Sequence, residues 1–595
     1  MANFYSDNED IKFLFRHIDL QPVVKLQEED FRFAGEFDYA PADGNEAIEN
    51  YEMVLASLGQ LSAEFIAPRA EEVDKEGNTL NADGTVSYAK GIRESLEKLA
   101  QAEVMGFTLP YRFGGLNFPN VVYTMAVEIV SRADASLMNI FGLQGIAETI
   151  NAFASEEIKQ KYLHKFAKGE VTGAMVLTEP DAGSDLQAVK LRAFEDVNGR
   201  WFLHGVKRFI TNGCGEVLLV LARSEPDRSG GLGLSLFVCD RGPTVHIRRL
   251  EEKLGIHGSP TCEIFFDNTP CEIIGERQRG LVTYVMSLMN GARVGIAAQS
   301  MGIAEAAYNL ARDYAASRRQ FGVAIEKLPA VRDMLIDMKI AIETGRALLY
   351  ETSVMVDYEI NYTQISETNP PADKEKSKEM RNTLKKYSRF ASMLTPMSKY
   401  YCSEMCNRAA YDAIQVLGGS GYMRDYAAER YYRDARITTI YEGTSQLQIV
   451  AAVRGVCNGT AERLLTEYAA MQYDESLKDL LEKLTAGTEQ LKRSIAYVKE
   501  NGNEYMDLYG RAIVDIAIDL ICGYLFCGQA STKAAGQMPQ SEGEPVSMKE
   551  RKTIIARRFI SKAMPEIAAL AEQICSGDKS TLIDYEKLVP PVSGE

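Results

Sequence analysis

The stretch Leu177-Thr-Glu-Pro-Asp-Ala-Gly-Ser-Asp185 lies where the sequence changes from helical to strand-like patterning. From Glu46 to about Gly169, apolar residues recur at helical spacing, as in Tyr51-x-x-Val-Leu-x-x-Leu58. Short runs rich in β-branched and aromatic residues then follow, separated by Gly, Asn and Asp turns. They predict strands at Val171–Thr178, Trp201–His204, Val217–Ala222, Leu234–Val238, Val245–Arg248 and Cys262–Phe266. Several short strands in succession indicate a β-barrel or sandwich, and the quoted stretch is the turn after its first strand.

The helical pattern returns at Gly280 and continues to the end of the chain, with two interruptions. Asn361–Lys378 contains adjacent prolines and many charges, so it is predicted to be a loop between long helices, because two prolines cannot lie inside a helix. Ala534–Ser547, rich in Gly, Pro and Ser, is the second interruption. The predicted fold is α+β, in five segments: an N-terminal extension (1–45), a helical domain (46–170), a β-domain (171–279), a helical bundle (280–458) and an additional C-terminal helical domain (459–595).

Composition excludes several classes of protein. Asp and Glu exceed Lys and Arg by 83 to 66 among 595 residues, and a net charge of −17 argues against nucleic-acid binding. The acidic, polar N-terminus has neither the pattern of a secretory signal nor that of a transit peptide, and we expect no membrane span, so a cytoplasmic location is predicted. The ten cysteines and five histidines lack metal-ligand spacing, and no metal site is expected.

The first motif that can take part in binding or catalysis is the quoted stretch, Leu177–Asp185. Its exposed backbone N–H groups and hydroxyls can hold an anion or the edge of a flavin ring, and Gly183 permits close approach of the backbone. The alternative is a tight acidic turn without a ligand.

The second motif, Gln415-Val-Leu-Gly-Gly-Ser-Gly-Tyr422, is followed by Asp425, Arg430 and Asp434. Its three glycines end the preceding helix and expose amides that can bind a pyrophosphate, although a simple helix C-terminus and turn would show the same glycines. The spacing is not that of GxGxxG after a strand, so a Rossmann fold is not predicted.

The third motif, Ile440-Tyr-Glu-Gly-Thr-Ser-Gln446, places the carboxylate of Glu442 between apolar residues and a glycine. Apolar neighbours raise the pKa of a carboxyl group, which suits it to act as a general base. A glutamate at the surface is the alternative.

Together the motifs resemble those of the acyl-CoA dehydrogenase family. The first matches the family's flavin-contacting signature, the second matches its second signature at every spaced position, and the third is similar to its catalytic-base segment. Tyr314–Gly322 resembles the segment that reaches the FAD of the neighbouring subunit, and Lys207–Asn212 resembles the strand along the isoalloxazine ring. The resemblance covers about residues 46–455. It implies a helical domain, a β-barrel or sandwich and a four-helix bundle in that order, here followed by an additional helical domain.

The resemblance also implies a reaction and its residues. Such an FAD-dependent oxidoreductase removes two hydrogens from Cα and Cβ of an acyl-CoA thioester, giving the trans-2-enoyl-CoA. Glu442 matches the base, and its backbone N–H matches a donor to the thioester carbonyl. Residues implied to contact FAD are Thr178, Ser184, Phe209, Thr211, Arg318, Gln320, Phe321, Gln415, Gly418, Gly419, Thr444 and Gln446. Residues implied to contact the substrate are Ser184, Arg293, Tyr441 and Gly443, with a helix salt bridge as the alternative for Arg293.

The chain is longer than the compact members of this family. Its extra segments resemble those of a longer bacterial subgroup that includes 3-methylmercaptopropionyl-CoA dehydrogenases. The expected partners are an acyl-CoA, as in fatty acid β-oxidation and lipid metabolism, and an electron-transfer flavoprotein as acceptor. An acyl-CoA oxidase that uses oxygen and a non-catalytic scaffold on the same fold are the alternatives. Apolar stripes in 459–588 predict a helical bundle that covers a family interface, which favours a homodimer over a tetramer. Membrane contact is not expected.

Overall fold

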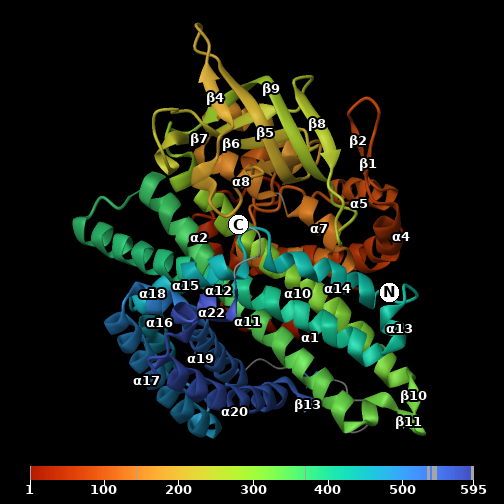
Figure 1. Ribbon diagram of the computed structural model, residues 1–595, viewed down its shortest axis with the longest axis vertical. Helices are drawn as coiled ribbons and strands as arrows, with labels where there is room; N and C mark the ends of the chain where they lie inside the picture. The colour runs from red at the N-terminus through yellow and green to blue at the C-terminus, as the bar shows by residue number, and fades with distance from the viewer. Residues whose placement is uncertain (1, 143, 369, 533–536, 539–545, 591–595) are drawn as a thin grey trace. The chain divides into compact units, whose positions relative to one another are not determined.

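The computed structural model describes residues 2–142, 144–368, 370–532, 537–538 and 546–590, and the chain divides into two compact units (Figure 1). Unit 1 consists of Met1–Tyr387 and Ser398–Ser445, and unit 2 of Ser388–Met397 and Gln446–Glu595. The strands of the main sheet lie between residues 173 and 274, with helices before and after them. The predicted α+β class is therefore confirmed.

Unit 1 begins with helices that precede the main sheet. They are α1 (Glu9–His17), α2 (Gln21–Gln27), α3 (Gly44–Leu61), α4 (Ala70–Glu76), α5 (Lys90–Gln101), α6 (Asn120–Ala133), α7 (Ala135–Phe141), α8 (Gln144–Phe153) and α9 (Glu156–Ala167), with a small hairpin β1 (Thr79–Leu80) and β2 (Val86–Ser87). The elements after the sheet are α10 (Met286–Ser317), the hairpin β10 (Arg319–Gln320) and β11 (Val323–Ala324), α11 (Pro329–Thr368), α12 (Lys374–Leu417), α13 (Gly419–Tyr422) and α14 (Ala428–Arg436).

The main sheet closes on itself. Its strands are β3 (Gly173–Val176), β4 (Arg192–Glu195), β5 (Trp201–Thr211), β6 (Val217–Arg223), β7 (Leu234–Asp240), β8 (Val245–Leu250) and β9 (Thr261–Ile274). The order is β3-β6-β4-β5-β9-β7, and β7 also pairs with β6, which completes a barrel, while β8 adds to β9. β4 was not predicted, because its sequence Arg192-Ala-Phe-Glu195 places two adjacent apolar residues between charges and shows no apolar alternation. Strands β5 and β9 are longer than predicted.

Strand β6 is buried on both faces, which explains its unbroken apolar sequence. Leu219 and Leu221 pack in a cluster with residues of α8 and α9, such as Ile146 and Phe166. The alternate residues of β6 belong to a second cluster with side chains of β5, β7 and β9. The strand therefore joins the helices to the interior of the barrel.

The loop predicted over Asn361–Lys378 is wrong for most of its length. Helix α11 continues through Thr368, and α12 begins at Lys374. Asp373 caps α12, because its carboxylate accepts the backbone N–H groups of the next turn. The charged residues of this segment remain helical, and the Pro370-Pro371 pair interrupts the helix only between Thr368 and Lys374. The second predicted interruption, Ala534–Ser547, lies mostly outside the described residues, apart from the paired strands β12 (Gln537–Met538) and β13 (Val546–Ser547).

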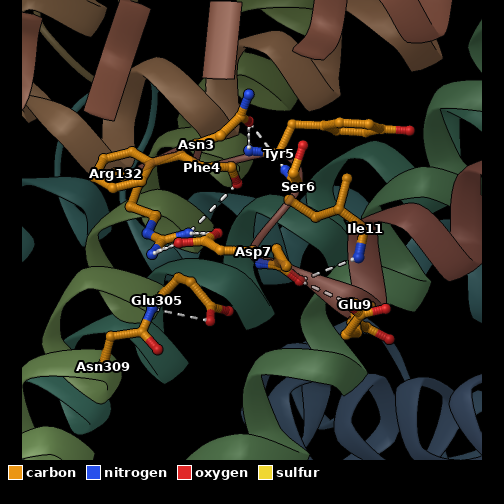
Figure 2. Close-up of polar contacts among 12 residues, drawn as sticks. Asn3, Phe4, Tyr5, Ser6, Asp7, Glu9, Ile11, Arg132, Glu305 and Asn309 are labelled. Carbon is orange, nitrogen blue, oxygen red and sulfur yellow. Dashed lines mark hydrogen bonds and ion pairs between the residues drawn. The ribbon is translucent and has the colours of Figure 1, made fainter. Parts of the chain in front are cut away.

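The N-terminal residues pack onto the helices of unit 1 (Figure 2). The guanidinium of Arg132 on α6 donates to both carboxylate oxygens of Asp7, at 2.6 and 2.8 Å, and lies over the ring of Phe4. Asn8 caps α1 by accepting backbone N–H groups of its first turn. These contacts place residues 2–18 within the body of unit 1.

A buried ionic cluster joins three helices of unit 1 to α1. Arg346 on α11 is fully buried and donates to Asp10 at 2.5 Å, to Glu128 at 2.6 Å and to Glu305 at 2.7 Å. Tyr350 adds a hydrogen bond of 2.7 Å to Glu128. Arg346 contacts all three carboxylates, while Lys339 adds a longer ion pair of 3.7 Å to Glu305, so the cluster depends mainly on Arg346.

Unit 2 is helical. It contains part of α12, α15 (Ser445–Cys457), α16 (Thr460–Ala469), α17 (Lys478–Asn501), α18 (Asn503–Leu508), α19 (Gly510–Ala530), α20 (Met548–Ile574), α21 (Ser580–Ile583) and α22 (Tyr585–Leu588). The predicted apolar stripes are buried here, including Leu480, Leu484, Ile513, Ile516 and Leu520. Two helices in the described residues, Gly280–Ser317 and Gly510–Ala530, are long and apolar enough to cross a membrane, but core helices pass the same test, and 72% of the apolar window of α19 is buried.

We predict that Arg346→Met lowers the free energy of unfolding of unit 1 by about 3–5 kcal/mol, because three buried carboxylates lose the guanidinium that they share, although Glu305 keeps Lys339 at 3.7 Å. The single tryptophan, Trp201 in β5, reports urea unfolding of this unit by fluorescence. Arg408→Met is the control, since Arg408 forms an exposed pair with Asp412 and its loss should cost about 0–1 kcal/mol. Equal losses in the two variants would contradict the role of the cluster.

Candidate active site

Glu442 lies in the short loop between α14 and α15, in a left-handed backbone conformation. Its φ is +55°, and that of the following Gly443 is +95°. A side-chain-bearing residue pays roughly 1–2 kcal/mol for this conformation. Such strain persists where the surroundings impose it, and strained residues are common at functional sites.

Two cationic side chains hold this turn. The Nε of Arg293 on α10 donates to the carbonyl oxygen of Glu442 at 3.4 Å. The Nζ of Lys399 on α12 donates to the carbonyl oxygen of Gly443 at 2.8 Å. Lys399 is fully buried, and Arg293 is additionally placed by a 3.0 Å bond to Asn290. Consecutive carbonyl groups therefore each accept a hydrogen bond from a cation on a different helix.

Burial raises the pKa of the Glu442 carboxyl above its usual value, and the charges of Arg293 and Lys399 oppose that rise. Burial likewise lowers the pKa of Arg293. The site thus combines a carboxylate made more basic by its surroundings with positive charges that still favour its ionised form. This combination suits a general base.

The residues on either side of the turn are also fixed. The hydroxyl of Tyr441 donates to Gln299 on α10 and, at 3.3 Å, to Asn139 on α7. Gln299 is held in turn by Nε2 bonds of 2.9 Å to Asn139 and to the carbonyl oxygen of Ala135. Ser445 donates to Glu404 on α12 at 2.6 Å. Tyr441, expected at the substrate, therefore also anchors the turn to α7 and α10.

The first motif is held to β5 by a buried ion pair. Lys207 lies 3.0 Å from Glu179 and donates to the carbonyl oxygen of Leu177 at 2.7 Å. Glu179 also accepts the backbone N–H groups of Lys190 and Leu191, at 2.8 and 2.9 Å. Both charges are nearly inaccessible to solvent, so the conformation of the motif depends on this pair.

A bulge in β5 turns Phe209 outward beside this motif. The pairing of β5 with β9 shifts register between Lys207 and Ile210, and Phe209 has a φ of +62°. Its ring is 51% exposed, which is unusual for a phenylalanine in a strand. Bulges commonly re-aim a side chain in this way. Phe209 thus presents an aromatic surface next to Thr178, whose carbonyl oxygen accepts the N–H of Arg208 at 3.0 Å.

The polar groups around Phe209 fit a flavin. In the described part of the chain, the side-chain hydroxyls of Thr178, Ser184 and Thr211 have no hydrogen-bond partner from the protein. The loop of the first motif and strand β5 thus carry three hydroxyls without a protein partner, and β5 also carries the exposed ring of Phe209, which matches a ligand that combines a flat ring with polar edges.

The remaining residues expected at FAD form a second group in unit 1. Arg318, Gln320 and Phe321 lie at the end of α10 and on the β10–β11 hairpin, where Phe321 is 90% exposed with a φ of +51°. Gln415, Gly418 and Gly419 lie at the end of α12, and a Cβ at either glycine would meet no atom within 4 Å. A 3.2 Å bond from Tyr314 to Ser420 joins these two segments. Figure 1 shows the hairpin far from the main sheet within unit 1.

Other predicted residues have simpler settings. Thr444 lies within the Glu442 turn, and Gln446 is exposed in the first turn of α15. Asp434, from the second motif, is buried and accepts the backbone N–H of Ile256 at 2.5 Å, so it joins α14 to the β-domain. Among the described residues, no group of three or more His, Cys, Asp or Glu side chains could hold a metal ion.

The sequence analysis did not identify Lys399 and Glu404, which hold the turn, and gave no separate role to Lys207, which pairs with Glu179. Each is a single charged residue within a helix or strand pattern, and its neighbours in the sequence do not show that it is buried. Lys207 is a partial exception, because it lies on the same inward side of its strand as buried apolar residues. A charge at such a position needs a buried partner.

Models of one family match nearly the whole chain. The N-terminal domain of acyl-CoA dehydrogenase matches residues 48–170, the middle domain matches 174–269, and the C-terminal domain matches 279–366 and 377–456. A further model, acyl-CoA dehydrogenase C terminal, matches residues 457–567.

Individual relatives agree. The chain is 34% identical to an acyl-CoA dehydrogenase of Bacillus subtilis over 61% of this chain and 90% of the relative. It is 32% identical to the 3-methylmercaptopropionyl-CoA dehydrogenase of Ruegeria pomeroyi, over 74% of each.

Solved structures show the same fold. A chain in the structure described as an electron transferring flavoprotein of Acidaminococcus fermentans is 31% identical, with a TM-score of 0.59 over 69% of this chain and 98% of that one. An acyl-CoA dehydrogenase complexed with FAD from Bacillus anthracis is 21% identical, with a TM-score of 0.73 over 92% of both chains, which supports the fold of both units.

The fold of unit 1, the Glu442 turn and these matches lead to one conclusion. The chain belongs to the acyl-CoA dehydrogenase family of FAD-binding oxidoreductases and carries that family's additional C-terminal domain.

Proposed function

We propose that this protein is an FAD-dependent acyl-CoA dehydrogenase that converts an acyl-CoA thioester into its trans-2-enoyl-CoA. The observation that carries the proposal is the Glu442–Gly443 turn. It presents a carboxyl group with a raised pKa in a left-handed turn held by two cations. A general-base reaction requires both the basicity and the fixed position.

Glu442 takes the proton from Cα of the acyl group. Its ionised form is the reactive one, and the nearby positive charges oppose the rise in its pKa that burial causes. Its backbone N–H, next to carbonyl groups already engaged by the cations, is the donor proposed for the thioester oxygen, where negative charge develops. Bound FAD would supply the acceptor for the hydride that leaves Cβ.

The residues that would hold FAD come from two copies of the chain. Thr178, Ser184, Phe209 and Thr211 form one group at the main sheet, together with Thr444 and Gln446 beside the turn. The other group is Arg318, Gln320, Phe321, Gln415, Gly418 and Gly419. Their separation within unit 1 supports a homodimer in which each FAD contacts both subunits.

An electron-transfer flavoprotein is the proposed acceptor, and a role in fatty acid β-oxidation in the cytoplasm is part of the proposal. The similarity to a chain in a solved electron transferring flavoprotein structure supports this acceptor. Oxygen consumption with an acyl-CoA, without added acceptor, would instead identify an oxidase.

The first prediction is that Glu442→Gln still binds FAD and acyl-CoA but reduces its flavin roughly 10²–10⁴ times more slowly, because the substitution removes the base and little volume. Anaerobic stopped-flow bleaching of the flavin, across a panel of acyl-CoAs, measures the rate.

Glu148→Gln is the matched control for that experiment. Glu148 on α8 is another carboxyl whose pKa burial raises, and it accepts a 2.5 Å bond from Thr108. Its Oε2 lies 4.0 Å from the position of a Cβ on Gly291, two residues before Arg293. Glu148→Gln should reduce its flavin at close to the wild-type rate. The opposite result, with slow reduction in Glu148→Gln alone, would make Glu148 the base.

The second prediction concerns the cofactor. The purified protein should be yellow, with one FAD per chain, and Phe209→Ala should raise the dissociation constant for FAD about 2- to 12-fold, as expected from losing an aromatic contact of about 0.5–1.5 kcal/mol. Phe194→Ala, an exposed phenylalanine on β4, is the control. Equal FAD affinity in both variants would remove Phe209 from the flavin site.

The third prediction concerns the subunit arrangement. Light scattering should give twice the 66.0 kDa mass of one chain. Phe321→Asp, which places a charge on the hairpin, should release FAD and dissociate the dimer, whereas Leu232→Asp, at an exposed leucine of the β-domain, should do neither. A monomer with a full complement of FAD would exclude the shared site. A tetramer would exclude only the covering role predicted for the C-terminal bundle.

A further inference from the structure

Lys399 has a setting unlike that of Lys207, the other buried lysine described in unit 1. Its side chain is inaccessible to solvent, as is that of Lys207. Lys207 forms an ion pair with Glu179 at 3.0 Å, whereas Lys399 donates to the carbonyl oxygen of Gly443 at 2.8 Å. A buried ammonium is costly unless nearby charge compensates it. The position of Lys399 next to the catalytic turn therefore calls for an explanation beyond packing.

The charged groups that face Lys399 come from three elements. They are Glu442 in the turn, Arg293 on α10 and Glu404 on α12, the helix of Lys399 itself. Burial lowers the pKa of Lys399 to about 7, and the charge of Glu442 opposes that change. Below about pH 7, Lys399 therefore carries its proton.

We propose that Lys399 is a positioning residue, which holds the strained Glu442–Gly443 turn through the Gly443 carbonyl and places a positive charge near the Glu442 carboxylate. This inference deepens the proposed function and rests on Glu442 being the base.

The helix that carries Lys399 makes the positioning effective. Glu404, five residues further along α12, accepts the hydroxyl of Ser445 at 2.6 Å. One rigid helix therefore holds the loop at Gly443 and again at Ser445, while Arg293 holds it at Glu442 from α10. Because the left-handed conformation is unfavourable for Glu442, removal of a contact on either side should let the turn relax.

The charge of Lys399 has a separate effect. A positive group near a carboxylate lowers the pKa of that carboxyl, and its removal raises the pKa. The two roles can be separated by substitution. Lys399→Gln keeps a hydrogen-bond donor without the charge, Lys399→Arg keeps both, and Lys399→Met keeps neither.

The test is an infrared pH titration of the Glu442 carboxyl in the FAD-loaded protein, with Glu442→Gln used to assign its band. In Lys399→Met and Lys399→Gln, the titration midpoint should move upward by about 1–3 on the pH scale, the range typical for loss of one opposite charge next to a carboxyl group. In Lys399→Arg it should stay close to the wild-type value. An unchanged midpoint in both neutral variants overturns the electrostatic role.

Flavin reduction supplies the second readout. The pH at which the reduction rate reaches half its maximum should move upward with the infrared midpoint in the neutral variants, and Lys399→Arg should restore it. At high pH, where Glu442 is ionised in every variant, Lys399→Met should remain slower than Lys399→Gln because it also lacks the donor to Gly443. Equal rates there overturn the positioning role.

Lys552→Met is the matched control, since it removes a fully buried lysine from α20 in unit 2. It should change neither the midpoint nor the pH profile. If Lys399→Met does not accumulate as folded protein, the comparison of Lys399→Gln with Lys399→Arg decides the electrostatic role. The infrared midpoint needs no turnover, so failure of every acyl-CoA to bleach the wild-type flavin would refute the proposed function while the titration still decides the influence of Lys399.

Discussion

The left-handed turn at Glu442 and Gly443 is the constraint on which the rest of this site depends. Its backbone conformation is unfavourable, and two cations on two helices, Arg293 and Lys399, engage its consecutive carbonyl oxygens. The same two charges favour the ionised carboxylate that burial disfavours. The side chains that contact this turn are therefore the same ones whose charges oppose the rise in the pKa of Glu442, and they lie on α10 and α12.

The β-domain exposes an aromatic ring while its sheet stays closed. The barrel is closed by pairing of β6 with β7, and β6 is buried on both faces, although β5 contains an irregularity. The bulge there turns Phe209 outward, and the buried Lys207–Glu179 pair holds the adjacent loop with its free hydroxyls. The second set of residues expected at FAD lies on a distant hairpin and at a helix end, and for this reason the proposed FAD site includes a second copy of the chain.

The order of helices, strands and helices could be predicted from periodicity, because helical and strand patterns of apolar residues differ. The positions of the three motifs could also be predicted, since glycine clusters and a single carboxylate between apolar residues can be recognised in a short stretch of sequence. The predicted loop over Asn361–Lys378 is mostly wrong, because the adjacent prolines interrupt the helix only between Thr368 and Lys374, and the charged residues on either side remain in solvated helices. The strand β4 escaped prediction because it has no apolar alternation.

By itself the sequence determined the α+β class, the family resemblance and the identity of Glu442 as the candidate base, since all three rest on local spacing. Only the tertiary structure decided how Glu442 is held and charged. Lys399 is 43 residues from Glu442 and Arg293 is 149 residues away, and their approach depends on the packing of α10 and α12 against the loop. The exposure of Phe209 and the separation of the two cofactor groups were decided in the same way. They depend on register and on long-range packing, which no local pattern encodes.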